Sequence, residues 1–350
     1  MHSNYSANGK QTLDEILKNT KEKSFDIISI TDHDSLKVYA EIYEIVKNGL
    51  IESLIIPGIE FTVDNREYGN QCHMLQLFVN PKDDVILKDV SKNYDAMFNG
   101  SKIQFDRLNV NLAIQDILKN YDLSISFDEY KNYLFNNGFV PEYDTLCFYL
   151  IEKFKKMGVT TFEILDLLEK YNEIYSYEDR KYYKEKRYKK LREKYSFNDV
   201  NKFNSRFLLS MLAVREVDDD WWDYPACGSL SVNSYGQLKV SELNEKYDIY
   251  FAHPTEGSLD VVNKLVKIKK NIVGLEMNIR NSYNDINRFY NVLNKNDLIE
   301  IKGSDSHDSS MQFYENMDYY KVNALDFMKV LKWGRKDNGI KKRYSWTWKL

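Results

Sequence analysis

The residues of this chain best suited to chemistry are its five histidines: His2, His33, His73, His253 and His307. All but His2 lie beside a short apolar segment that favours a strand, and so do three carboxylates, Asp32, Glu60 and Asp305. Imidazole and carboxylate donors without thiolates suit zinc, manganese or iron, and two or three ions sharing a carboxylate form a hydrolytic site. Any single histidine is more often an ordinary core or surface residue, so the prediction depends on their joint placement.

The elements that must position these residues alternate between strand and helix at both ends of the chain. Short apolar, β-prone runs precede the candidate ligands at residues 25–30, 53–56, 249–252 and 298–301. Apolar residues at helical spacing follow or separate them at residues 13–17, 38–46 and 259–266. This order predicts a mainly parallel sheet or barrel, in which polar residues at strand ends build the active site.

The composition sets the class of protein. The 350 residues are 43% hydrophobic and 14% aromatic, which excludes a disordered chain, a small disulfide scaffold and a collagen-like fibre. Lys and Arg number 49 against 53 Asp and Glu, so nothing in the overall charge favours a general nucleic-acid or membrane-surface binder. The three cysteines are few and scattered, and no apolar run approaches the roughly 18 residues of a membrane span, so we expect a cytoplasmic protein with reduced thiols.

Six short motifs together resemble the PHP family, the polymerase and histidinol phosphatase group of metal-dependent phosphoesterases. They are His2-Ser3, Thr31-Asp32-His33, Gly58-Ile59-Glu60, His73-Met74-Leu75, Ala252-His253-Pro254 and Ser304-Asp305-Ser306-His307. Their order and spacing carry the resemblance, which covers about residues 1–80 and 240–310. It implies an α/β fold, a distorted seven-stranded β/α barrel with two to three divalent ions (Zn, Mn or Fe) at the C-terminal ends of the strands.

The resemblance also implies a role for each matching residue. One ion would be held by His2, Glu60 and Asp305, and a second by Glu60, His73 and His253. A third would be held by His33 and His307, with Asp32 as a ligand or as its immediate partner. The residues expected to act in catalysis are Glu60, His253, Asp305 and His307.

One departure from the family pattern concerns the start of the chain. Relatives carry a further histidine directly before the position of Met1, within a stretch of the form Asp-Leu-His-Met-His-Ser. We therefore expect the natural start to lie upstream of Met1. If that histidine is truly absent, the first ion lacks a ligand, and a degenerate barrel with a structural or regulatory role becomes the non-enzymatic alternative.

The middle of the chain has a different pattern of apolar residues. Apolar stripes at helical spacing predict a mostly helical insertion at residues 95–235, between the two parts of a discontinuous barrel at residues 1–94 and 236–350. Within it, residues 180–194 contain nine basic residues, two acidic residues and three tyrosines. This segment is either the solvated face of a long helix or a guide for a nucleic-acid strand.

The function predicted from these features is a metal-dependent hydrolase of phosphoric esters. We expect a phosphatase that acts on a small phosphomonoester, a nucleotide or a sugar phosphate, through a metal-bridged hydroxide. Candidate cations for the substrate phosphate are Lys10, Arg66, Lys302 and Arg280, of which Arg280 is favoured by its place at a strand end. The alternative is an exonuclease or oligonucleotide phosphodiesterase that uses the basic segment.

Overall fold

The computed structural model of the chain describes residues 1–6, 9, 11–49, 53–64, 72–109, 112–141, 143–160, 163, 166, 237–254, 256–278 and 286–307. It divides into two compact units. The first consists of Met1–Asp95 together with Gly236–Leu350, and the second of Ala96–Tyr235.

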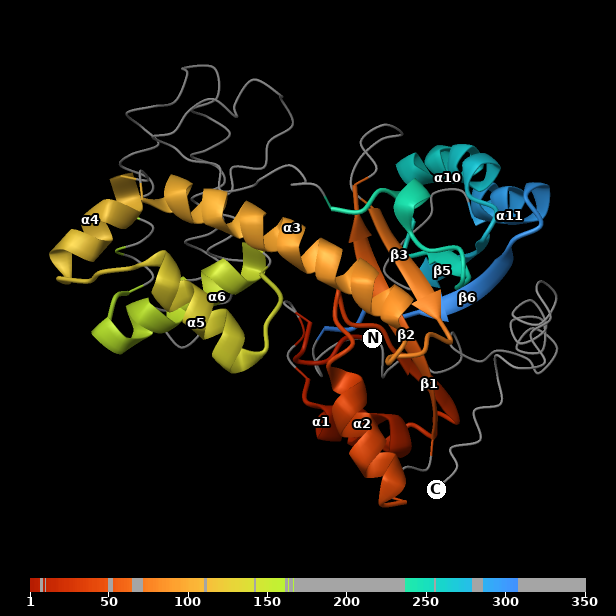
Figure 1. Cartoon of the computed structure of the whole chain (residues 1–350), viewed down its shortest axis with the longest axis horizontal. Coiled ribbons are helices and arrows are strands. Elements are labelled where there is room, and N and C mark those ends of the chain that lie inside the picture. The colour runs from red at the N-terminus through yellow and green to blue at the C-terminus, as the bar shows by residue number, and fades with distance from the viewer. Residues whose placement is uncertain are drawn as a thin grey trace. The chain divides into compact units, whose positions relative to one another are not determined.

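The first unit contains one curled sheet of six strands in the order β1 to β6 (Figure 1). The strands are β1 (Ile27–Ile30), β2 (Leu54–Val63), β3 (Cys72–Leu77), β4 (Ile249–Phe251), β5 (Ile272–Asn278) and β6 (Ile299–Gly303). The predicted strands at residues 25–30, 249–252 and 298–301 are confirmed within a few residues. The strand predicted at residues 53–56 is longer than expected, because β2 continues through Glu60 to Val63.

Three of the five strand pairs are parallel, and both pairs made by β3 are antiparallel. The sheet is therefore mainly parallel, as predicted, but with one reversed strand. The reason lies in chain length, since β2 ends at Val63 and β3 begins at Cys72. A parallel crossover needs about a dozen residues or more, so this shorter link returns the chain in the opposite direction.

The start of the chain lies between the ends of β1 and β6. Thr31, just after β1, donates its backbone N–H to the Met1 carbonyl at 2.9 Å. His2 donates its own N–H to the Ser306 carbonyl, beyond β6, also at 2.9 Å. Six strands, rather than the seven of the expected barrel, are present in the described part of the chain.

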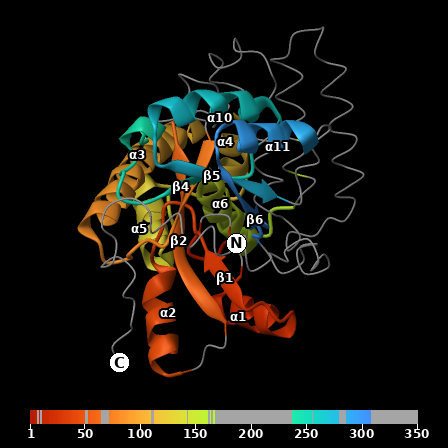
Figure 2. The ribbon, with the colours of Figure 1, turned by 90° about the vertical axis from the view of Figure 1, so that its right-hand side faces the viewer.

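Four helices of the first unit pack on the sheet (Figures 1 and 2). They are α1 (Leu13–Glu22), α2 (Val38–Lys47), α10 (Glu256–Ile268) and α11 (Ile286–Lys295). The first, second and third confirm the helices predicted from apolar spacing. A capping box starts α1, in which the Thr12 hydroxyl accepts from the Glu15 N–H and the Glu15 carboxylate accepts from the Thr12 N–H.

The core lies between the sheet and these helices. Ile16, Ile42, Leu259 and Phe289 bring one buried face from each helix to it. A smaller cluster, centred on Leu75, Tyr250 and Val273, fills the other face of the sheet. The candidate ligands lie at one edge of this packed scaffold, either past a strand end or, for Glu60 and His73, within a strand, and the scaffold fixes their positions.

A buried asparagine ties this scaffold together next to the site. Asn93 lies on α3 (Asp84–Leu108) and is fully buried. Its Nδ2 donates to Asp34 Oδ1 at 2.7 Å and to the Thr62 carbonyl at 2.9 Å. Its Oδ1 accepts the Leu238 N–H at 2.7 Å. One side chain thus links a helix, the turn after β1, the strand β2 and the segment that leads to β4.

We expect Asn93→Ala to lower the free energy of unfolding by about 3 kcal/mol or more, because a buried carboxylate, a carbonyl and an N–H lose their partner together. Denaturant unfolding followed by circular dichroism measures this change. Asn99→Ala, an exposed position on the same helix, is the control and should change stability by less than about 0.5 kcal/mol. Equal stability of the two variants would contradict the role given to Asn93.

Helices make up the described part of the second unit. The helix α3 continues into it and is followed by α4 (Leu112–Asn120), α5 (Phe127–Asn137) and α6 (Tyr143–Met157). Ser126 caps the start of α5, and Gly138 ends it in the left-handed conformation at a φ of 67°. Buried aromatic rings, among them Phe105, Tyr130 and Tyr149, fill the space between these helices.

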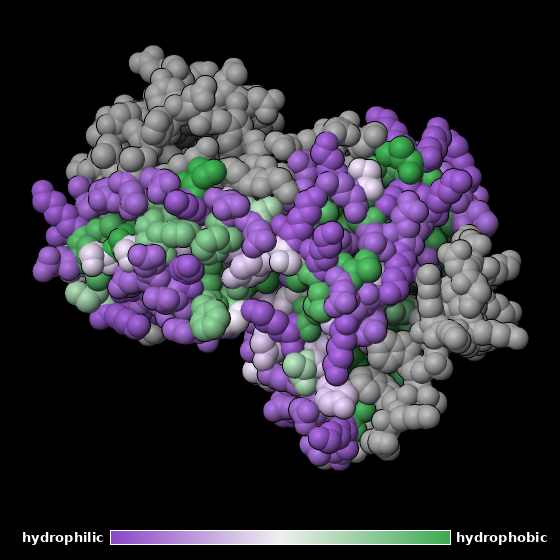
Figure 3. Space-filling view, in the orientation of Figure 1, coloured by the Kyte–Doolittle hydropathy of each residue, from purple (hydrophilic) through white to green (hydrophobic). Residues whose placement is uncertain are grey.

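Hydrophilic side chains cover most of the described surface on the face shown in Figure 3. Among the described residues, no helix combines the length and the apolar character that crossing a membrane requires.

Candidate metal centre

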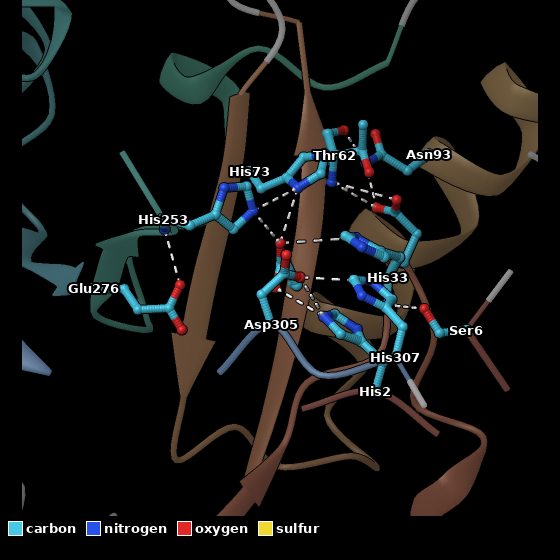
Figure 4. Close-up of polar contacts among 12 residues, drawn as sticks. His2, Ser6, His33, Thr62, His73, Asn93, His253, Glu276, Asp305 and His307 are labelled. Carbon is cyan, nitrogen blue, oxygen red and sulfur yellow. Dashed lines mark hydrogen bonds and ion pairs between the residues drawn. The ribbon is translucent and has the colours of Figure 1, made fainter. Parts of the chain in front are cut away.

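All five histidines converge on one site together with Glu60 and Asp305 (Figure 4). They come from both ends of the sequence and from different strands. The segment after β1 supplies His33, the segment after β4 supplies His253, and the segment after β6 supplies Asp305 and His307. Parallel strands place these ends at one edge of the sheet.

The reversed strand explains the place of His73. This residue is the second of β3, and because β3 runs antiparallel to its neighbours its beginning lies at the edge where β4 ends. Glu60 is not at a strand end but inside β2. It nevertheless lies level with His33, because β2 extends beyond the end of β1 and the backbone of His33 forms a β-bridge with that of Glu60.

Glu60 is the centre of the cluster. Its Oε1 lies 2.9 Å from His73 Nδ1, 3.2 Å from His253 Nε2 and 3.9 Å from His33 Nδ1. Its Oε2 lies 3.6 Å from His2 Nε2. Only 3% of this side chain is exposed, so one buried carboxylate faces four imidazoles.

The second carboxylate faces the other side of the group. Asp305 Oδ1 lies 3.4 Å from His2 Nε2 and 3.5 Å from His307 Nε2. The His2 ring is nearly parallel to two other rings, with its centroid 4.5 Å from that of His33 and 4.4 Å from that of His307. Two sets of three residues bring their donor atoms close together, with all the atoms of a set within 4.8 Å of one another. One set is His2, His33 and His307, and the other is His33, Glu60 and His73.

Burial keeps the inner imidazoles neutral. It lowers the pKa of His2 to about 3 and that of His307 to about 2, and it lowers the pKa of His33 well below the ordinary value. A neutral imidazole has a lone pair available for a metal ion. At neutral pH these three side chains can therefore bind an ion without first losing a proton.

Glu60 and His253 form the charged pair of the site. Burial alone would raise the pKa of Glu60, but the electrostatic effect of the nearby His33 imidazole and the hydrogen bonds from His253 and His73 hold it well below its usual range. Burial likewise works against a charge on His253, but its hydrogen bond to Glu60 and the charge of that carboxylate raise its pKa to about 10. In the absence of a metal ion, His253 thus carries a proton at neutral pH.

The cluster fits a group of divalent ions. Both ring nitrogens of His2 and the Nδ1 of His33 are buried and have no hydrogen-bond partner among the described residues. A buried polar atom without a partner costs about 1–3 kcal/mol, and such atoms call for an explanation such as a bound ion. Nitrogen and carboxylate donors, with no thiolate in the cluster, are the chemistry expected for zinc, manganese or iron.

Asp32 contacts the start of the chain instead of the inner histidines. Its Oδ1 accepts the Ser3 N–H and its Oδ2 accepts the Ser3 hydroxyl, both at 2.6 Å. This geometry favours the alternative in which Asp32 supports its neighbours, because holding Ser3 fixes the backbone next to His2.

Three non-glycine residues at the site have left-handed backbone conformations. The φ angle is +48° at Asp34, +28° at His253 and +46° at Asp305. Such conformations are costly and persist only where the surroundings enforce them, and they are enriched at functional sites. Two of the three are candidate ligands, so the backbone itself aims His253 and Asp305 into the cluster.

Glu276 is the residue of this site to which the sequence prediction gave no role. It lies inside β5, is only 7% exposed, and its Oε2 accepts the His253 N–H at 2.8 Å. Burial raises its pKa to about 7. The available signal was a lone carboxylate in the run Ile272–Asn278, an otherwise uncharged segment that reads as a buried strand.

Of the four cations predicted to bind the substrate phosphate, only Lys302 lies among the described residues. Lys302 forms an ion pair with Glu300. Arg280, Lys10 and Arg66 lie outside the described residues, as does the basic segment 180–194, and their roles stay predictions.

The cluster has a closed side and an open side. The side chains of His2 and His33 are 0% and 3% exposed, whereas those of His73 and His253 are 29% and 28% exposed. Asp305 is intermediate, at 20%. A small molecule from solvent therefore reaches the His73, His253 and Asp305 side of the cluster first.

Two solved structures resemble the chain as a whole. One comes from Bifidobacterium adolescentis, and its description as a metal-dependent phosphoesterase is itself a prediction; it has a TM-score of 0.57 and 13% identity, over 97% of this chain and 96% of that one. The other is described as an amidohydrolase from Chromobacterium violaceum, with bound sulfate and no metal. It has a TM-score of 0.53 and 13% identity, over 88% of this chain and 86% of that one. At this identity the likeness shows the fold.

Comparison with curated proteins finds no relative of this chain. A family model described as the PHP domain matches residues 1–132. That range includes His2, Asp32, His33, Glu60 and His73, the first part of the site. The resemblance expected from the motifs is confirmed over residues 1–132, which match the model of the PHP domain.

Proposed function

We propose that this chain is a metal-dependent hydrolase of phosphoric esters whose substrate is a small phosphomonoester, either a nucleotide or a sugar phosphate. The observation that carries the proposal is the convergence of five histidines on Glu60 and Asp305 at one edge of the sheet. The PHP domain match supports the class of reaction, since the family is one of metal-dependent phosphoesterases.

The residues present divide into three ligand sets. His2, Glu60 and Asp305 would hold one ion, and Glu60, His73 and His253 a second. His33 and His307, whose ring centroids lie 6.0 Å apart, would hold a third. When bound, such ions lower the pKa of a coordinated water and neutralise charge on a phosphate.

The protein's own groups prepare that chemistry. Glu60 contacts members of all three sets, so it fixes their spacing. We assign Glu60, His253, Asp305 and His307 to the reacting side. Asp305 and His253 are partly exposed, as is His73, while Glu60 contacts His253 and His307 is adjacent to Asp305. We also infer that the six strands belong to a seven-stranded barrel and that residues 95–235 form a helical insertion.

The test is metal analysis of the purified chain followed by assays on a panel of nucleotides and sugar phosphates. We expect chelation to abolish hydrolysis and Zn²⁺, Mn²⁺ or Fe²⁺ to restore it. Glu242→Gln, an exposed carboxylate paired with Lys92, is the control and should keep full activity. A folded, fully loaded chain that hydrolyses no phosphoester would overturn the proposal and favour a degenerate barrel.

The same panel tests the alternative function. Short oligonucleotides are included, and a nuclease that uses residues 180–194 should lose binding steeply as salt is added. An amide substrate completes the panel, because one similar structure is described as an amidohydrolase. Preference for either of these substrates over mononucleotides and sugar phosphates would contradict the proposed substrate class.

A further inference from the structure

The backbone of His253 is in a conformation that an ordinary histidine avoids. Its φ is +28°, and Pro254 follows it directly, which restricts the preceding residue further. The chain enters this turn from β4, where Ala252 donates its N–H to the His73 carbonyl at 3.0 Å. Something beyond local preference must therefore hold the His253 peptide in place.

Glu276 supplies that constraint from the neighbouring strand. Its Oε2 accepts the His253 N–H at 2.8 Å. The carboxylate is itself buried, and a carboxylate acceptor makes a stronger hydrogen bond than a neutral one. The His253 peptide is thus fastened to β5.

The space for this carboxylate exists because residue 303 is a glycine. A Cβ added to Gly303 would lie 1.5 Å from Glu276 Oε1 and 2.1 Å from its Cδ. Gly303 ends β6, two residues before Asp305. The glycine and the carboxylate therefore form one fitted unit that spans β5, β6 and the end of β4.

We propose that Glu276 is a positioning residue, which sets the backbone at His253 and thereby aims its imidazole at Glu60 and His73. The inference rests on the proposed metal centre and deepens it. The His253 imidazole reaches both residues, since its Nε2 lies 3.2 Å from Glu60 Oε1 and 3.1 Å from His73 Nδ1. The contact that Glu276 makes with this site is the one to the His253 backbone N–H, so it acts through His253.

Two conservative variants separate the hydrogen bond from the charge. Glu276→Gln keeps the length of the side chain and an acceptor oxygen but loses the negative charge. Glu276→Asp keeps the charge but is one methylene shorter, so it loses reach. A positioning acceptor tolerates the first change and not the second, whereas a metal ligand or a charge partner shows the opposite preference.

The first measurement is amide hydrogen exchange on the metal-free full chain, labelled with ¹⁵N at histidine alone and carrying no added histidines. The spectrum then has five histidines to assign, and two serve as internal controls: the His2 N–H is bonded to the Ser306 carbonyl and the His33 N–H to Ser6 Oγ. We expect exchange at His253 to stay within about threefold in Glu276→Gln and to quicken about tenfold or more in Glu276→Asp.

The second measurement is the affinity for Zn²⁺. We expect a loss of about tenfold or more in Glu276→Asp and less than about threefold in Glu276→Gln, since partners that orient a ligand typically affect affinity 10–100-fold. Asp89→Asn, which alters a half-buried carboxylate that accepts the Asn244 N–H away from the site, should match the wild type.

The proposal is overturned if both Glu276 variants leave His253 exchange unchanged, if both quicken it equally, or if the order of the two is reversed. A wild-type chain that binds no Zn²⁺ contradicts the proposed function, while the exchange measurement on the metal-free chain still decides the role of Glu276.

Discussion

Glu60→Gln is expected to abolish phosphate-ester hydrolysis and to remove at least one bound ion per chain. The reason is its central place, with one oxygen 2.9 Å from His73 and 3.2 Å from His253 and the other 3.6 Å from His2. Glutamine keeps the volume but replaces a carboxylate oxygen by an NH₂ group, which cannot bind an ion. Losing a shared ligand should cost activity about 1,000-fold or more, beyond the 10–100-fold typical of outer partners.

The measurements are metal content by mass spectrometry and kcat on the best substrate of the panel. Glu242→Gln serves as the matched control, because it makes the same chemical change on an exposed side chain. The variant should fold, since its isosteric side chain leaves the packing of β2 intact. Full metal content together with activity within about tenfold of the wild type would contradict the central role of Glu60.

The strand-end histidines could be predicted because their signal is local. An apolar run followed by Thr31-Asp32-His33 or by Ala252-His253-Pro254 marks the end of a buried strand without any knowledge of the fold. The position of His73 could not be derived in this way, because it depends on β3 running antiparallel. That direction is a consequence of the short link from β2, which the sequence pattern alone does not reveal.

Residues that act through tertiary contacts are harder to predict from the sequence. Asn93 is one polar residue in a long helix, and only packing shows that it bonds to Asp34, Thr62 and Leu238. The fit between Glu276 and Gly303 brings together two strands, and neither residue by itself predicts the other. The ligands at strand ends could thus be predicted from the strand pattern, whereas His73 and the supporting residues depend on which strands become neighbours and in which direction they run.

The affinity of the site for Zn²⁺ is expected to rise about tenfold per pH unit between pH 7 and 9, through His253. A metal ion binds only the unprotonated imidazole, and Glu60 raises the pKa of His253 to about 10 against the effect of burial. Below that pH, each unit of acidification reduces the unprotonated fraction about tenfold, so affinity falls with it. His2, His33 and His307 add no such slope here, because burial lowers their pKa values and they are already neutral.

Competition with a chromophoric chelator at pH 7, 8 and 9 measures the slope of log affinity against pH. His253→Gln is the control, since it removes this one titrating ligand and leaves every other source of proton release in place. The wild-type slope should exceed that of the variant by about one proton per ion. Because Glu60 makes the largest contributions that oppose burial, Glu60→Gln should also lower the pKa of His253, with the charges of Asp305 and Glu276 left to oppose burial. Equal slopes in the wild type and His253→Gln would show that the proton displaced by the ion does not come from His253.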